Sequence, residues 1–337
     1  MQIHQHYPLK AQNTFGFDVK ARYYAEPTNL AELKSLLSDV SFRELPLLIL
    51  GGGSNLLFRG NFEGLVIHPK FIAITATVLN NNEVIVSAGA GVIWDDLVVY
   101  CDRSGWGGLE NLSGIPGTVG AAPVQNIGAY GVEAKDSITE VEALRLDTLE
   151  TIRFTNADCC FGYRDSIFKQ EWKNKLVITK VKFRLSTQAD LKTYYGGLSE
   201  LLKSLPSVGI EEVREAVLQI RKEKLPNPAE IGNAGSFFKN PTVPKTTASA
   251  LQAAYPQLTV YPVDDNKVKI PAGWLIEQCG WKGKLLGRVG VHKAQALVLV
   301  NYGAGTGEEI LQLAAAIWQS VVERFDIELE MEVNVVN

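Results

Sequence analysis

The sequence predicts an α+β fold with two domains, and three observations indicate it. The first half of the chain is rich in short β-branched or apolar runs separated by Gly and Asn turns. After about residue 188, amphipathic helical patterns alternate with short strands. Two glycine-rich segments, low in charge, lie in the first half. A chain of 337 residues is also long enough for two or three domains, each with its own core.

Strands are predicted in the first half wherever an apolar run is bounded by turn residues. They are Pro46–Gly51, Gly64–His68, Ile72–Leu79, Val84–Ala88, Ile138–Leu146, Glu150–Thr155 and Leu176–Leu185. One helix, Ile93–Arg103, is predicted between them because apolar residues recur at helical spacing, at Trp94, Leu97, Val98 and Cys101.

The second half is predicted to contain more helix. The predicted helices are Ile210–Lys222, Lys245–Ala254, Ala272–Gln278 and Thr306–Arg324. The last of these begins with Thr306 and Glu309, a capping box. A buried strand is predicted between His292 and Asn301. The segment Ile327–Val335 alternates apolar and charged residues, which predicts a final strand.

Composition excludes several classes of protein. A formal net charge of -4 argues against nucleic acid as a main partner. No apolar run is long enough for a membrane span, and the N-terminus lacks the apolar core of a signal peptide. The four cysteines show no CxxC spacing and the four histidines no metal-ligand pattern. We therefore expect a reduced cytoplasmic protein with no metal and no membrane partner.

The glycine-rich segments predict a phosphate ligand. Leu50–Asn55 reads Leu-Gly-Gly-Gly-Ser-Asn directly after a strand, and Gly114–Gly120 leads into Gln125–Gly131. Glycines allow main-chain N–H groups to converge on one anion. Each segment alone could be a simple turn, but two of them favour a diphosphate. The sequence lacks a P-loop, and Trp94 stands where the third glycine of a GxGxxG motif would be, so a non-Rossmann flavin fold remains.

Seven motifs, in order, carry a resemblance to a known family. They are Asn13–Gly16, Gly51–Asn55, Gly108–Leu112, Ile115–Gly120, Gln125–Gly131, Phe161–Lys169 and Gly232–Pro241. Over about residues 8–334 the chain closely resembles the UDP-N-acetylmuramate dehydrogenases, also called UDP-N-acetylenolpyruvoylglucosamine reductases.

The resemblance implies two domains. The first, residues 17–188, would be an FAD-binding domain of the p-cresol methylhydroxylase/vanillyl-alcohol oxidase type, with two lobes split near residue 70. The second, residues 189–337, would be a smaller α+β substrate-binding domain whose last strand can return to the active site. Members of the family are usually monomers, so a monomer is expected.

The resemblance also implies noncovalent FAD, with NADPH as the hydride-donating co-substrate. No His or Cys lies within the glycine-rich segments, where many related oxidases attach FAD covalently. The implied cofactor-binding residues are Gly51, Gly52, Gly53, Ser54, Asn55, Ile115, Pro116, Gly117, Thr118, Gly120, Asn126, Gly128 and Tyr130.

The implied reaction reduces an enolpyruvyl ether on a UDP-sugar to a lactyl ether. The resemblance assigns Ser236 as proton donor, with Arg164 and Glu332 stabilising the enolate. Without it, Arg164 would be read as a surface ion-pair residue, Ser236 as a buried hydroxyl or helix cap, and Glu332 as part of a solvated strand face. Near Glu332, Met331 replaces a proline that is usual in the family, and Asn334 replaces a common arginine.

Substrate contacts are implied in the same way, for the subtype whose tyrosine loop closes over the substrate. Lys224 would meet the UDP diphosphate, and the loop would contribute Tyr195. Tyr163, Asn240, Tyr261 and Gln295 would make other contacts to the UDP-sugar, the expected small-molecule partner.

Two other functions remain open at this point. One is an oxidase of the same flavin fold that uses oxygen as acceptor. The other is a noncatalytic nucleotide-binding or regulatory protein, which would bind ligand without turnover. Flavin reoxidation by air would favour the first, and a UDP-sugar-dependent NADPH oxidation assay would decide against both.

Overall fold

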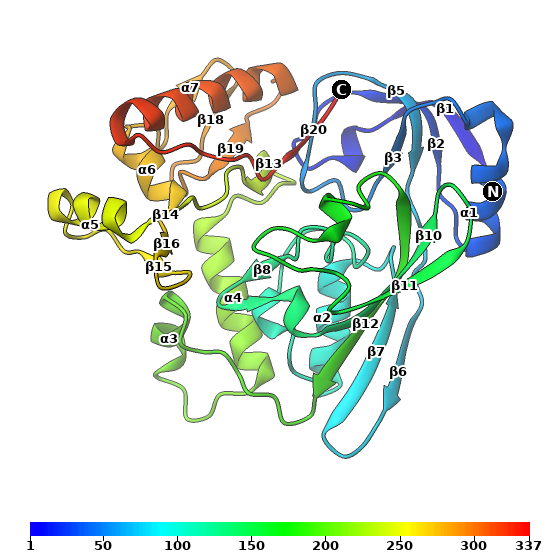
Figure 1. The fold of residues 1–337 in the computed structure, drawn as a ribbon, viewed down its shortest axis with the longest axis horizontal. Helices are drawn as coiled ribbons and strands as arrows, with labels where there is room; N and C mark the ends of the chain where they lie inside the picture. The colour runs from blue at the N-terminus through cyan, green and yellow to red at the C-terminus, as the bar shows by residue number, and fades with distance from the viewer. The chain divides into compact units, whose positions relative to one another are not determined.

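The computed structural model describes residues 1–337, which divide into two compact units (Figure 1). The first unit comprises Met1–Tyr7, Ala21–Gly53 and Phe62–Lys222. The second comprises Pro8–Lys20, Ser54–Asn61 and Glu223–Asn337. Each unit is thus assembled from segments that are distant in the sequence.

A four-stranded sheet, in the order β1-β2-β5-β3, forms one part of the first unit. Its strands are β1 (Ile3–Pro8), β2 (Lys20–Ala25), β3 (Leu47–Ile49) and β5 (Phe62–Ile67). β2, β5 and β3 are parallel, which requires crossover connections. Helix α1 (Leu30–Ser38), capped by the Asn29 side chain, connects β2 to β3. Its Leu33 and Leu36 are buried in a cluster with Leu65 and Ile67 of β5.

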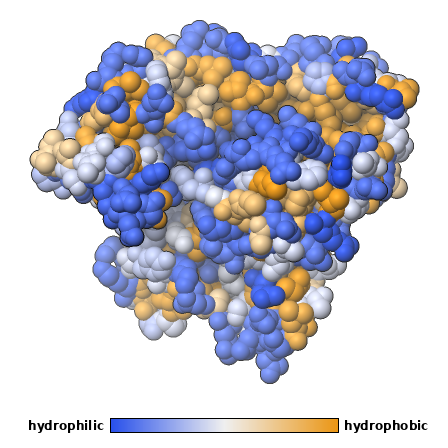
Figure 2. All heavy atoms as spheres, in the orientation of Figure 1, coloured by the Kyte–Doolittle hydropathy of each residue, from blue (hydrophilic) through white to orange (hydrophobic).

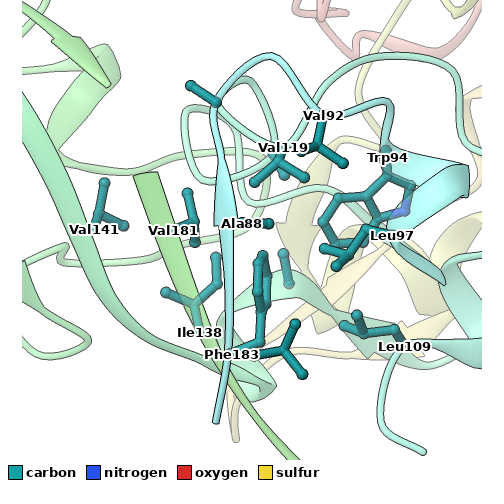
Figure 3. Packing of buried hydrophobic residues seen from close by; sticks show 14 of the residues in the cluster. Ala88, Val92, Trp94, Leu97, Leu109, Val119, Ile138, Val141, Val181 and Phe183 are labelled. Atoms are coloured by element: carbon teal, nitrogen blue, oxygen red, sulfur yellow. The ribbon is translucent and has the colours of Figure 1, made fainter. Parts of the chain in front are cut away.

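A five-stranded antiparallel sheet, in the order β11-β10-β12-β7-β6, forms the other large part of the first unit (Figure 1). Its strands are β6 (Ile74–Val78), β7 (Glu83–Gly89), β10 (Ile138–Arg145), β11 (Thr151–Thr155) and β12 (Leu176–Ser186). Helix α2 (Trp94–Arg103) packs against it through Trp94, whose ring meets Phe183 of β12 edge-on at a centroid distance of 5.8 Å (Figure 3). This apolar cluster is the main core of the unit.

Two helices and a short hairpin complete the first unit. Helix α3 (Gly197–Leu202) and helix α4 (Ile210–Lys224) bury Leu198, Val213 and Val217 against each other. The ring of Tyr130 packs on this cluster. Tyr130 belongs to the turn between the two-residue strands β8 (Gly128–Ala129) and β9 (Val132–Glu133).

The second unit contains three small sheets. The largest has the order β13-β19-β18-β17, with β13 (Gly232–Ser236), β17 (Leu285–Leu286), β18 (Val289–Val291) and β19 (Val298–Asn301). A second contains β14 (Thr242–Pro244), β16 (Lys267–Lys269) and β15 (Tyr261–Pro262). The third pairs β4 (Leu56–Phe58) with β20 (Asn334–Val336) in parallel. Its helices are α5 (Lys245–Ala254), α6 (Ala272–Gln278) and α7 (Gly307–Phe325).

The structure confirms most of the predicted elements. The helices predicted at Lys245–Ala254 and Ala272–Gln278 match α5 and α6 residue for residue. The predicted capping box of α7 is present, with Thr306 accepting from the Glu309 N–H and Glu309 accepting from the Thr306 N–H. The first-half strands also lie within a few residues of their predicted bounds.

The predicted strand at Ile327–Val335 is wrong over most of its length. Only Asn334–Val336 forms a strand, because β4 offers partners only there. Upstream, Met331 makes a single bridge to Phe238. Met331 is 42% exposed, so it does not share the buried face of Leu329 and Val333 that strict alternation predicts.

No helix of the structure is both long enough and apolar enough to span a membrane. On the face drawn in Figure 2, hydrophilic residues separate the apolar patches. The absence of a membrane-spanning helix agrees with the hydropathy of the sequence.

A closed ring of hydrogen bonds joins four polar side chains beside the four-stranded sheet, with Tyr24 and His68 buried and Glu26 and Lys70 partly exposed. Lys70 donates to Nε2 of His68 (3.3 Å), and Nδ1 of His68 lies 2.7 Å from the Tyr24 hydroxyl. The Tyr24 hydroxyl donates to Glu26 (2.8 Å), and Lys70 lies 3.3 Å from the same carboxylate. Since Lys70 only donates, His68 must be the neutral tautomer with its proton on Nδ1. Burial, with the nearby Lys70 charge, lowers the pKa of His68 to about 4.

The low pKa of His68 predicts that the stability of the fold decreases in acid. The pKa of His68 is about 4 in the folded chain and about 6.5 ordinarily, so between these values the unfolded chain binds more protons. Stability should therefore fall by about 2–3 kcal/mol as pH drops from 6.5 toward 4. Urea unfolding across this range measures it. His68→Asn should flatten the dependence, and an unchanged slope in that variant would show that His68 is not its source.

Candidate active site

The two predicted phosphate loops lie against each other in the first unit. A Cβ atom on Gly51 would lie 2.8 Å from Oγ1 of Thr118, and one on Gly52 would lie 2.7 Å from Cα of Gly117. Real Cβ atoms do not approach so closely, so both positions require glycine. Gly53 and Gly117 also have positive φ angles, 61° and 135°. The two loops therefore form one glycine-lined site.

Main-chain donors in these loops are available to a ligand. The N–H groups of Gly52, Gly117 and Thr118 donate to no carbonyl of the chain. The second loop is held by two other hydrogen bonds. The Trp94 N–H donates to the Gly117 carbonyl, and the Val119 N–H donates to the Val92 carbonyl. Unpaired N–H groups on adjacent glycine turns form a site suited to an anion. The arrangement fits the diphosphate of a dinucleotide cofactor such as FAD.

A partly buried ion pair fixes the start of the second loop. The Asp95 carboxylate of α2 accepts two hydrogen bonds from Arg214 of α4, both 2.8 Å, and a third from the Gly114 N–H (2.6 Å). Burial alone would raise the pKa of Asp95, but Arg214 and the Gly114 N–H outweigh it and lower the pKa. Arg221 of α4 donates to the Gly114 carbonyl (3.1 Å). Sequence reasoning missed these residues, since each resembles an ordinary charged helix residue.

The Asn126 side chain joins the hairpin that follows it to the turn that carries Arg164. Its side chain is buried, and its Nδ2 donates to the Gly162 carbonyl (2.9 Å) and to Glu133 (3.0 Å). Its Oδ1 accepts from the Lys135 N–H (3.0 Å). The polar groups of Asn126 are therefore used within the chain, where they join Gly128–Ala129 and its neighbours to the turn that carries Arg164.

Arg164 lies at the corner of a tight turn. Gly162 and Asp165 exchange main-chain hydrogen bonds of 3.0 and 3.3 Å across it. Arg164 has a φ angle of 54°, in the region that favours glycine. Its Nη2 donates to the Gly128 carbonyl (2.7 Å), and its guanidinium lies 5.4 Å from the Tyr163 ring centroid. These contacts hold a cationic group, suited to a carboxylate, in a defined orientation.

Two of the three predicted tyrosines of the first unit, Tyr130 and Tyr195, lie together. The rings of Tyr130 and Tyr195 meet edge-on, with centroids 6.3 Å apart. Tyr195 is 40% exposed, whereas burial raises the pKa of the Tyr130 hydroxyl. The two rings thus come from segments of the same unit that contact each other.

Ser236 lies at the end of β13, after an irregularity in the strand. The register with β19 shifts between Asn233 and Ser236, and Gly235 there has a φ angle of 69°. Asn233 fixes this bulge by accepting from the Gly235 N–H (3.0 Å). Such a bulge redirects the side chain that follows it. Ser236 is partly exposed, and its hydroxyl makes no hydrogen bond within the chain, so it can meet a ligand.

Glu332 lies beside Ser236 in the second unit. The Glu332 N–H donates to the carbonyl of Phe237, the residue after Ser236 (2.8 Å). Asn55 joins the same cluster, since its Nδ2 donates to the Glu332 carbonyl (3.1 Å) and its carbonyl accepts from the Asn334 N–H (3.0 Å). The structure therefore brings together one predicted cofactor-binding residue and two predicted catalytic residues.

Two predicted substrate residues meet at the start of α6. Oδ1 of Asn240 accepts from the Ala272 N–H (2.9 Å). A Cβ on Gly273 would lie 3.0 Å from Oε1 of Gln295. Lys224, at the end of α4, and Tyr261, in β15, are exposed. Arg164 belongs to the first unit and Ser236 and Glu332 to the second, so their meeting at one substrate stays a prediction.

Comparisons with known proteins identify the family. UDP-N-acetylenolpyruvoylglucosamine reductases are 47% identical in Amoebophilus asiaticus, over 100% of both chains, and 46% identical in Bacteroides fragilis, over 98% of this chain and 99% of that one. The Chromobacterium violaceum reductase is 48% identical over 98% of both chains. The chain belongs to the UDP-N-acetylenolpyruvoylglucosamine reductase family. It is an FAD-dependent oxidoreductase of peptidoglycan synthesis.

Family models and a solved structure confirm the predicted fold. The FAD binding domain model matches residues 21–152, and the model of the UDP-N-acetylenolpyruvoylglucosamine reductase C-terminal domain matches residues 227–336. The crystal structure of the Thermus caldophilus reductase (MurB) aligns with a TM-score of 0.68 at 24% identity, covering 100% of this chain and 98% of that one. Residues 153–226 lie between the two models, so the predicted domain boundary at residues 188/189 stays a prediction.

The ion pair behind the second loop makes a testable prediction for the reductase. Asp95→Asn should cost about 2–4 kcal/mol of stability, because it leaves Arg214 partly buried without its counter-charge. It should also weaken FAD retention, since a neutral amide holds Gly114 and Arg214 less strongly than the carboxylate does. Urea unfolding and flavin content on gel filtration measure the two effects. Asp147→Asn removes an exposed partner of Arg145 and should change stability by less than about 1 kcal/mol. Equal effects of the two substitutions would contradict the prediction.

Proposed function

We propose that the chain catalyses the NADPH-dependent reduction of UDP-N-acetyl-3-O-(1-carboxyvinyl)-glucosamine to UDP-N-acetylmuramate through FAD. The observation that carries this proposal is the similarity over the whole chain, at 46–48% identity, to reductases named for the enolpyruvyl sugar. The adjacency of Ser236 and Glu332 supports it, because two residues widely separated in the sequence lie next to each other.

Bound FAD would supply the hydride chemistry, with NADPH as the hydride donor and the terminal carbon of the enolpyruvyl double bond as the acceptor. Gly51–Gly53 and Ile115–Gly120 would hold its diphosphate with main-chain N–H groups. Hydride addition drives negative charge through the α-carbon onto the substrate carboxylate. The Arg164 guanidinium would pair with that carboxylate, and the interaction strengthens as charge accumulates.

Ser236 would deliver a proton to the α-carbon to complete the lactyl ether. A serine hydroxyl is a weak acid, but an enolate carbon is a strong enough base to accept its proton when the two are positioned together. Glu332 can stabilise the developing negative charge only in its protonated form, since a carboxylate would repel it. The main-chain hydrogen bond from Glu332 to Phe237, the residue after Ser236, supports pairing the two residues in this step.

Six residues are proposed to hold the UDP-sugar. Lys224 would offer a cation to the diphosphate, and Tyr163, Tyr195 and Tyr261 would offer hydroxyls. Asn240 and Gln295 would contact the sugar or base, although Oδ1 of Asn240 already accepts from the Ala272 N–H and Oε1 of Gln295 from the Leu297 N–H. Such contacts give affinity for the part of the substrate that does not react.

One spectroscopic experiment tests the proposed function against the two other candidates. The purified protein should carry a flavin that NADPH bleaches and the enolpyruvyl UDP-sugar restores under anaerobic conditions. An oxidase would instead be reoxidised rapidly by air, with no effect of the UDP-sugar. A noncatalytic binding protein would show ligand binding without either change. Restoration by the UDP-sugar alone supports the reductase.

Ser236→Ala should separate the two half-reactions. Flavin reduction by NADPH should stay within about twofold of the wild type, because no proton from Ser236 is needed in that step. Flavin reoxidation by the UDP-sugar should slow by about 10²- to 10⁴-fold, the range expected when a general acid is removed. Stopped-flow absorbance measures both rates.

Ser104→Ala provides a control, since Ser104 is an exposed serine after α2 that bonds only its own helix. It should leave both half-reactions unchanged. Equal losses of the two rates in Ser236→Ala would contradict the assignment of Ser236 as proton donor.

A further inference from the structure

The chain between β12 and α3 carries two exposed tyrosines on a weakly bonded main chain. We call residues 189–196 the tyrosine segment. Tyr194 is 70% exposed and Tyr195 40% exposed, and the segment ends at Gly196, whose φ angle is 49°. None of the N–H groups of residues 189–194 donates to a main-chain carbonyl. Its position must therefore be set by side chains.

Asn111 is a side chain that holds the tyrosine segment in place. Its side chain is fully buried, and its Nδ2 donates to the Lys192 carbonyl of the tyrosine segment (2.8 Å). The same Nδ2 donates to the Tyr130 carbonyl (3.0 Å). Because both partners are carbonyls, only the amide nitrogen can face them, which fixes the orientation of the side chain. One amide group therefore joins the tyrosine segment to the glycine-rich loop.

Both carbonyls belong to segments that position tyrosine rings. Tyr130 has a φ angle of 49°, and Gly131 follows it at 82°. The Tyr130 ring meets the Tyr195 ring edge-on, and a Cβ on Gly131 would lie 3.5 Å from Cδ2 of Tyr195. If the Lys192 carbonyl moved away, Tyr195 would lose its contact with Tyr130. The hydrogen bonds of Asn111 therefore help to set the position of Tyr195.

The amide oxygen of Asn111 does not contribute to stability. Oδ1 of Asn111 is buried and accepts no hydrogen bond from the chain. A buried acceptor without a donor costs about 1–3 kcal/mol. An apolar residue of similar size would avoid that cost, so stability alone does not account for asparagine here. The two donated hydrogen bonds do account for it, because no apolar side chain can hold both carbonyls.

We propose that Asn111 is a positioning residue for substrate binding, which holds Tyr195 against Tyr130 by bonding both main chains. This proposal rests on the proposed function, since it assumes that Tyr195 contacts the UDP-sugar. Asn111 would act through Tyr195 and would touch neither the substrate nor the flavin. It would therefore affect affinity for the UDP-sugar and leave flavin reduction by NADPH unchanged.

Asn111→Leu tests the proposal in the flavin-loaded full chain. It should raise KM for the UDP-sugar by about tenfold, since two net hydrogen bonds of ordinary strength are lost. The kcat value and the rate of flavin reduction by NADPH should stay within about twofold. In a Tyr195→Ala background the same substitution should raise KM no further. Additive effects, or parallel losses of kcat, flavin content and affinity, would overturn the proposal.

Asn301→Leu is the matched control. Asn301 is also buried, but it lies in the second unit and all of its polar groups are used, with Nδ2 donating to Phe15 and Oδ1 accepting from Gly303 and Gly305. Its replacement should lower the free energy of unfolding and leave KM unchanged. If Asn111→Leu is not recovered folded, Asn111→Ala removes the same two hydrogen bonds.

A substrate-free measurement separates this inference from the proposed function. Chymotrypsin cleaves after tyrosines, and its rate at Tyr194 and Tyr195 reports how firmly the segment is held. Cleavage should be about tenfold faster in Asn111→Leu than in the wild type, and unchanged in Asn301→Leu. Equal cleavage in all three proteins overturns the positioning role. Faster cleavage in a protein that does not turn over the UDP-sugar keeps that role and rejects the proposed function.

Discussion

The first unit depends on the approach of two glycine loops to a distance at which no Cβ atom fits. Gly51 and Gly52 contact Thr118 and Gly117 so closely that any side chain would displace main-chain or buried atoms. This contact leaves main-chain N–H groups of both loops without partners in the chain, which is what a bound diphosphate requires. The loop after β3 also carries the chain from the first unit to the second, between Gly53 and Ser54.

Loops that keep their main-chain groups for a ligand must be held by side chains from the regular elements, because buried polar groups of the main chain need partners. Three buried or half-buried residues do this in the first unit. Asp95 of α2 accepts from Gly114, Asn126 bonds Gly162, and Asn111 bonds Tyr130 and Lys192. Each bond fixes a glycine-rich or irregular segment through a buried or half-buried side chain. The precision of the site therefore comes from residues that need not touch a ligand.

The sequence predicts the periodic elements well, because their signals are local. The spacing of Trp94, Leu97, Val98 and Cys101 reports the buried face of α2, and Thr306 with Glu309 reports the start of α7. The final strand is different, because its length is set by its partner β4, nearly 280 residues earlier in the chain. The same limit applies to the site. Glycine motifs indicate the loops from the sequence alone. The roles of Asn111, Asp95 and Arg214 depend instead on contacts between residues that are 81 to 119 positions apart in the chain.

Several residues of the first unit occupy the left-handed region that glycine would enter more easily, among them Asn126, Tyr130 and Arg164, with φ angles of 47°, 49° and 54°. Each costs about 1–2 kcal/mol relative to an unstrained residue. A glycine at any of them would relieve the strain but would also remove the contacts that these side chains make. Asn126 makes three hydrogen bonds, and Tyr130 packs on α3 and α4 and meets Tyr195. Arg164 is held by Gly128 and Tyr163 before any ligand arrives, so little further ordering is required when its guanidinium meets an anion.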